Sequence, residues 1–149
     1  MTSGEGNSET IATGSPQSYI DDMARRRGYV LEYHKIMANA DYLALIAAND
    51  LVEAVYLKSR LLDRRTKELL FIISLTIMRA SKSHIIAHIR VALALGVTKE
   101  EILEALEITL PEAGVVIFQE GLAAWREAVD AELLEPSAGI SVTGTAEGQ

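Results

Sequence analysis

The sequence of 149 residues contains no cysteine. The chain can therefore form no disulfide and supply no thiolate ligand to a metal, and thiol peroxidase and disulfide reductase chemistry are excluded. It also lacks internal repeats, strand-like alternation of useful length and glycine-rich phosphate loops. Amphipathic segments with a period near 3.6 residues fill it instead, and they predict an all-α fold of six or seven helices.

No apolar run reaches the roughly eighteen residues that a membrane span needs. Hydrophobic residues nevertheless make up 49% of the chain, so we expect surplus apolar surface to be buried in subunit contacts. The net charge is −7, or −3 without the four glutamates of the two tails, and such a surface does not favour nucleic acid as a partner. No leader-like segment is visible in residues 1–14, so we expect a cytoplasmic location.

A single domain is predicted over residues 15–134. The flanking residues 1–14 and 135–149 are rich in Ser, Thr, Gly and Glu, and we expect both tails to be disordered because they have little to bury. Helix-start and helix-stop residues divide the domain. The predicted starts are Ser15, Asp41, Asp63 and Thr98, and the predicted stops are Gly28, Gly96 and Pro136.

Residues 62–96 form the most informative stretch. The segment Leu69 to Met78 is apolar nearly all round, which predicts a buried helix, and a second helix follows up to Gly96. In that second helix Ser81, His84 and His88 have the spacing i, i+3 and i+7, so they line one face. Imidazole is the side chain best matched to proton transfer near neutral pH, and this stripe is the clearest chemical pattern in the chain.

The segments LDRRTKELL and HIIAHIRVALALGVTKEEILEAL, with the aromatic-bearing helix that follows, resemble the carboxymuconolactone decarboxylase family. This family contains cofactor-free decarboxylases and AhpD-like peroxidases. The similarity covers roughly residues 29–129 and implies the AhpD-like helical fold. The absence of cysteine places the chain outside the redox branch.

The redox branch carries a Glu, eleven residues and then Cys-x-x-Cys-x-x-x-His. By this resemblance Ser81 and His84 occupy the cysteine positions, His88 the histidine position and Glu68 the glutamate position. Here twelve residues separate Glu68 from Ser81. An extra residue in the turn between the helices would leave Glu68 directed at the site, whereas one inside the first helix would rotate it by about 100°.

The resemblance implies a cofactor-independent carbon–carbon lyase. Such an enzyme would act on a small oxo-acid, lactone or related carbonyl compound by His-mediated proton transfer, in a decarboxylation or an isomerisation. It also suggests a homo-oligomer, a trimer or a hexamer, with no metal and no cofactor. The predicted catalytic residues are His88, His84 and Glu68, and the predicted substrate-binding residues are Ser81, Arg65, Tyr33 and His34.

Two other functions stay open on the sequence alone. A His-x-x-x-His pair with a nearby Glu could bind a metal, although the Glu that follows the first His in zincins is missing here. The histidines could instead be structural, in a non-catalytic helical binding or assembly protein with a degenerate site.

Several of these residues also have ordinary structural interpretations. His34 fits a surface or interface histidine, and Arg25 to Arg27 fit a solvated helix C-terminus. Glu68 could be a surface residue paired with Arg64, and Ser81 could be only a helix cap.

Overall fold

The computed structural model describes residues 14–134. These residues form eight α-helices and one π-helical segment and contain no strand, which confirms the predicted all-α fold. The predicted tails are residues 1–14 and 135–149, and all of their residues except Gly14 lie outside the described residues. Among residues 14–134, no helix combines the length and the apolar composition that crossing a membrane requires.

The first helices form an N-terminal helix group. Its members are α1 (Pro16–Arg27), α2 (Glu32–Ala40), α3 (Tyr42–Val52) and the π-helical segment η1 (Glu53–Leu57). The predicted starts are confirmed, because Ser15 accepts the Ser18 N–H at 3.2 Å and Asp41 accepts the Ala44 N–H at 3.0 Å. Gly28 ends α1 with φ 88°, a left-handed conformation that favours glycine.

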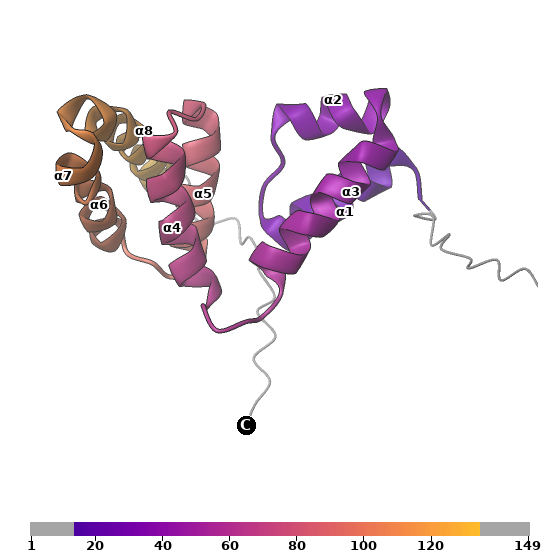
Figure 1. Cartoon of the computed structure of the whole chain (residues 1–149), viewed down its shortest axis with the longest axis horizontal. Coiled ribbons are helices and arrows are strands. Elements are labelled where there is room, and N and C mark those ends of the chain that lie inside the picture. The colour runs from indigo at the N-terminus through magenta and orange to yellow at the C-terminus, as the bar shows by residue number, and fades with distance from the viewer. Residues whose placement is uncertain (1–13, 135–149) are drawn as a thin grey trace, which may run out of the picture.

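The remaining helices form a C-terminal helix group, joined to the first by the loop that follows η1 (Figure 1). They are α4 (Arg64–Ile77), α5 (Lys82–Ala94), α6 (Lys99–Glu107), α7 (Thr109–Ala113) and α8 (Val115–Leu134). Asp63 caps α4, and Thr98 caps α6 with the reciprocal Glu101 contact of a capping box. In Figure 1 the C-terminal helix group lies on one side of the molecule and the N-terminal helix group on the other.

The main hydrophobic core lies within the C-terminal helix group. Helix α5 supplies much of it, with Ile85, Ile86 and Ile89 packed against α4, α6 and α8. Gly121 allows α8 to approach closely, since a Cβ there would lie 2.7 Å from Leu106 Cδ2 and 2.8 Å from Thr76 Cγ2. Helices α4 and α5 pack against each other as a helical hairpin, and α8 packs against both.

The turn of this hairpin accommodates the extra residue before Ser81. Helix α4 is unbroken as far as Ile77, and the chain then reverses with Arg79 at φ 54° and an Ala80 N–H bond to the Leu75 carbonyl of 2.9 Å. The α-helical phase of α4 is therefore preserved at Glu68.

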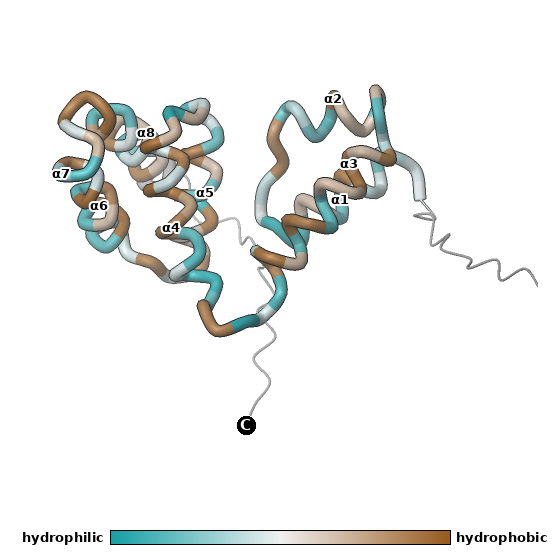
Figure 2. The backbone as a smooth tube through the Cα atoms, in the orientation of Figure 1, coloured by the Kyte–Doolittle hydropathy of each residue, from teal (hydrophilic) through white to brown (hydrophobic). Residues whose placement is uncertain are grey.

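Two sequence expectations about buried faces are wrong in detail. The sequence also suggests a short helix from Tyr29 to Ala38 with Val30, Tyr33, Ile36 and Met37 on one apolar side, but α2 begins at Glu32, and Tyr33 and Ile36 are both more than half exposed. The apolar segment of α4 is also not buried all round. Leu70, Ile77 and Met78 are exposed in this single chain, and Figure 2 shows hydrophobic residues spread along α3 and α4 and around α7.

Candidate functional site

A glutamate and a histidine meet inside the α4–α5 hairpin. Glu68 lies on α4 and is 0% exposed, and His88 lies on α5 and is 1% exposed. The distance from His88 Nδ1 to Glu68 Oε2 is 2.7 Å. A carboxylate accepts hydrogen bonds, so the Nδ1 atom carries the proton and the ring is held in one orientation.

The other oxygen of Glu68 is held by two residues. Tyr56, on η1, donates its hydroxyl proton to Glu68 Oε1, and Arg64 Nε donates to the same oxygen at 2.8 Å. Arg64 also donates from Nη2 to the Tyr56 hydroxyl at 2.7 Å, and its guanidinium lies 4.0 Å from the centre of the Tyr56 ring. Burial and the neighbouring Glu68 charge raise the pKa of Tyr56, so it stays a neutral donor.

The π-helical segment η1 explains how Tyr56 reaches Glu68. Single π-helical turns change the direction in which later side chains point, and they are frequent at functional sites. The segment ends at Leu57, and Lys67 of α4 donates from Nζ to the Tyr56 carbonyl at 3.3 Å. These contacts fasten the end of the N-terminal helix group to α4.

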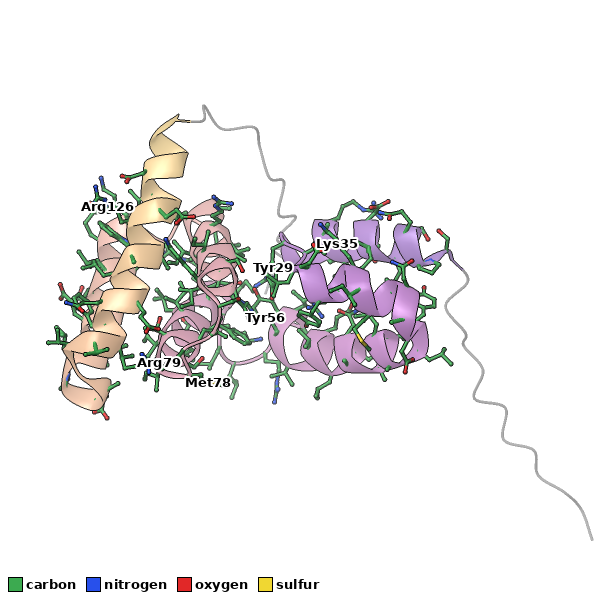
Figure 3. The ribbon with its side chains drawn as sticks, turned by 90° about the horizontal axis from the view of Figure 1, so that it is seen from above. Tyr29, Lys35, Tyr56, Met78, Arg79 and Arg126 are labelled. Atoms are coloured by element: carbon green, nitrogen blue, oxygen red, sulfur yellow. The ribbon has the colours of Figure 1, made fainter. Side chains whose placement is uncertain are left out.

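The second ring nitrogen of His88, Nε2, faces Tyr29. The Tyr29 hydroxyl lies 3.2 Å from His88 Nε2, and this nitrogen accepts the phenolic proton because Nδ1 already carries one. Burial, followed by the Glu68 charge, raises the pKa of Tyr29 to about 12. Phe71 stacks on the His88 ring with centroids 4.8 Å apart. Figure 3 shows Tyr29 and Tyr56 between the two helix groups.

His84 is the partly exposed neighbour of this cluster. His84 lies one helical turn before His88 on α5, and the two ring centroids are 5.3 Å apart. Burial, with a smaller contribution from the positive charge that His88 can carry, lowers the pKa of His84. The neutral form of His84 is therefore favoured at pH 7.

A second polar cluster lies in the N-terminal helix group. His34 accepts the Leu31 N–H at Nδ1 over 3.0 Å, and its Nε2 lies 3.3 Å from Arg27 Nη1. Arg27 also donates to the Asn49 side chain. Burial, followed by the Arg27 charge, lowers the pKa of His34 to about 4.

This second cluster corrects two interpretations of the sequence. His34 is 1% exposed and Arg27 is 3% exposed, so neither is the surface residue that its sequence context indicates. The physical reason is that the Leu31 N–H at the start of α2 needs a hydrogen-bond acceptor. The buried His34 ring supplies this acceptor through Nδ1.

The structure brings three of the predicted site residues together and leaves others apart. Glu68, His84 and His88 form one cluster. Ser81 is exposed, and its hydroxyl oxygen lies 3.2 Å from that of Ser83. Arg65 is exposed and pairs with Glu101 at 3.4 Å.

The two remaining candidates lie on α2. The ring centroids of Tyr33 and His34 are 4.0 Å apart, and His34 contacts Arg27. His84 contributes to the lowered pKa of His34, so the two polar clusters are close enough to influence each other electrostatically.

Sequence reasoning missed three aromatic members of the cluster, which are Tyr29, Tyr56 and Phe71. It assigned a substrate-binding role to Arg65, although Arg64 is the arginine that reaches the cluster. The available signal was the i, i+4 spacing of Arg64 and Glu68, which places both side chains on one face of α4.

The described residues offer no ready metal site. Among residues 14–134 no group of three or more His, Asp or Glu side chains is placed to hold a metal ion. A surface hollow between α1 and α2 includes Ser15, Ile20 and Lys35 in its lining, and none of the Glu68 cluster contributes to it.

Fold and geometry together define a class: an all-α protein with a buried Glu–His pair inside a helical hairpin. The sequence model of the carboxymuconolactone decarboxylase family matches residues 42–127 of this chain, which is more than half of its length. The chain belongs to this family, as a member without cysteine. No curated protein and no solved structure matches the chain. Tyr29 lies outside the matched region.

Proposed function

We propose that this protein is a cofactor-independent enzyme of the carboxymuconolactone decarboxylase type. It would transfer a proton to or from a carbon atom of a small oxo-acid, lactone or related carbonyl compound, in a decarboxylation or an isomerisation. The observation that carries the proposal is the 2.7 Å contact between Glu68 Oε2 and His88 Nδ1, which leaves His88 Nε2 as the nitrogen that can exchange a proton.

The chemistry requires few groups. In a decarboxylation the carbonyl or conjugated lactone of the substrate accepts the electron pair of the broken carbon–carbon bond, and an acid then protonates the resulting enolate. His88 serves as this acid, and Glu68 stabilises the imidazolium form and fixes its orientation. Arg64 and Tyr56 hold the Glu68 carboxylate in place.

A kinetic comparison of His88→Ala with the parent protein tests the proposal. Carboxymuconolactone and a panel of small 3-oxo acids are the first substrates to try. We expect His88→Ala to lose about 10²–10⁴ in kcat, the usual contribution of general acid–base catalysis, while circular dichroism stays helical. Arg90→Ala, an exposed position on the same helix, is the matched control. Near-normal kcat with an unchanged pH profile in His88→Ala would contradict the proposal.

We also propose that the protein works as a homo-oligomer, a trimer or a hexamer, in the cytoplasm. Exposed apolar side chains on three parts of the single chain support assembly. They are Leu43, Leu51 and Val55 on α3 and η1, Leu70 and Ile77 on α4, and Val115 and Val116 at the start of α8.

A non-catalytic assembly protein is the second candidate. It is favoured by one observation, namely that both ring nitrogens of His88 already have protein partners at 2.7 and 3.2 Å. In such a protein His88→Ala would lower stability, and no substrate in the panel would be turned over.

A further inference from the structure

Neighbouring side chains cover His88 Nε2, the ring nitrogen that would exchange a proton with a substrate. His88 is 1% exposed, its Nδ1 donates to Glu68, and its Nε2 is occupied by the Tyr29 hydroxyl at 3.2 Å. Tyr29 and His84, in contrast, are both partly exposed. A substrate that approaches His88 Nε2 therefore meets the Tyr29 hydroxyl first.

We propose that Tyr29 is a catalytic residue whose phenolic oxygen contacts the substrate, and that His88 exchanges protons with the substrate through it. This inference rests on the proposed function, because it names the group that completes the proton path from Glu68 and His88.

The proton steps balance without any further reactant. In proton abstraction a substrate C–H bond breaks and its electron pair passes into the neighbouring carbonyl, which becomes an enolate. The proton bonds to the Tyr29 oxygen, and the Tyr29 O–H proton passes to His88 Nε2. The imidazolium then faces the Glu68 carboxylate. In protonation the transfers run in reverse, from Tyr29 to the enolate carbon and from His88 Nε2 to Tyr29. A decarboxylation uses only this second half: carbon dioxide leaves, its bonding electron pair forms the enolate, and protonated His88 supplies the proton through Tyr29. After each turnover a proton from solvent returns to His88 Nε2 by the same path through Tyr29.

The pKa of Tyr29 supports a coupled transfer. Burial raises it to about 12, so a free phenolate is disfavoured near pH 7 and Tyr29 is a weak acid by itself. When the proton of His88 Nε2 replaces the phenolic proton during the transfer, no isolated phenolate has to form.

Tyr29 is also held firmly in place over α5. Gly28, the preceding residue, has φ 88°, and a Cβ there would lie 3.1 Å from Val91 Cγ2 on α5. The carbonyl of Arg27 accepts a hydrogen bond of 2.9 Å from Arg64, the residue that also binds Glu68. A segment tied to the cluster at both Arg27 and Tyr29 suits a fixed proton carrier better than a lid that must swing away.

Tyr29→Phe separates a proton carrier from a lid, because it keeps the ring and removes only the hydroxyl. On any substrate that the parent protein turns over, we expect Tyr29→Phe to lose about 10²-fold in kcat, a change in its pH profile and little change in KM. The matched control is Tyr42→Phe, since the Tyr42 hydroxyl is buried and has no partner among the described residues. Tyr42→Phe should keep normal kcat.

The outcomes of this comparison are distinct. Normal or faster turnover by Tyr29→Phe, with His88→Ala inactive, overturns the role of Tyr29 and leaves the proposed function intact. Near-normal turnover by His88→Ala instead overturns the proposed function itself.

A second experiment needs no substrate. Diethyl pyrocarbonate acylates unprotonated, accessible imidazole nitrogens, and mass spectrometry can assign the acylated histidine. In the parent protein and in Tyr29→Phe we expect His84 to react and His88 to be protected by the ring that covers it. His88 should become reactive in Tyr29→Ala, or in Tyr29→Leu if the alanine variant does not fold. The proposal would be overturned if His88 reacted equally in the parent protein and in the folded variant without the aromatic ring, Tyr29→Ala or Tyr29→Leu.

Discussion

The stability of the protein should fall between pH 7 and pH 5 because His34 is buried as a neutral ring. The side chain is 1% exposed, and burial together with the Arg27 charge lowers its pKa from 6.5 to about 4. Between these two values the unfolded chain binds more protons than the folded chain does. The contribution of His34 to stability is therefore fully present above about pH 6.5 and is lost as the pH falls toward 4.

The size of the effect follows from the two pKa values. The difference between 6.5 and about 4 corresponds to roughly 3 kcal/mol, of which about 2 kcal/mol is lost between pH 7 and pH 5. His84 acts in the same direction, because burial lowers its pKa too. Such a loss is a large fraction of the roughly 5–15 kcal/mol that stabilises a typical domain.

Urea unfolding at pH 7, 6 and 5 measures this loss, at fixed ionic strength and fixed protein concentration. His34→Asn is the informative variant, because its side-chain oxygen can accept the Leu31 N–H in place of Nδ1 but does not titrate. We expect the loss of stability between pH 7 and pH 5 to be smaller in this variant by about 2 kcal/mol. His84→Asn measures the separate contribution of His84. Identical pH dependence in the parent protein and His34→Asn would refute the reasoning.

Two further predictions concern assembly and packing. Light scattering at micromolar concentration should report a trimer or a hexamer, because α3, α4 and α8 expose apolar side chains in the single chain; a stable monomer of 16.2 kDa would contradict this. Gly121→Ala should lower stability by about 1–3 kcal/mol, because its Cβ would lie 2.7 Å from Leu106 Cδ2. Thermal unfolding measures this second effect, and an unchanged Tm would show that α8 can move away at no cost.

The helices could be placed from the sequence because their boundaries depend on local chemistry. Ser15, Asp41, Asp63 and Thr98 each accept the backbone N–H three residues later, and the structure confirms all four. The start of α2 is different. Its N-cap position, Leu31, has no capping side chain, so the helix start depends on His34 and on the packing around it.

Only part of the candidate site could be predicted from the sequence, because some of its contacts join residues that are distant in the chain. Glu68 and His88 could be paired through the family's spacing, and the structure brings them together. Tyr29 is separated from His88 by 59 positions, and no periodicity in its own segment indicates that contact. Tyr56 reaches Glu68 through a π-helical segment, which breaks the 3.6-residue period on which sequence reasoning depends.

The residues that surround Glu68 also join the two helix groups. Tyr29 lies in the connection between α1 and α2 and Tyr56 lies on η1, both within the N-terminal helix group and its connections, whereas Glu68 and His88 come from the C-terminal helix group. A substitution that adapts the cluster to a new substrate therefore also weakens the attachment between the halves of the molecule. We expect epistasis across this junction: changes at Tyr29 or Tyr56 should be tolerated mainly when a second change on α4 or α5 restores the lost contact.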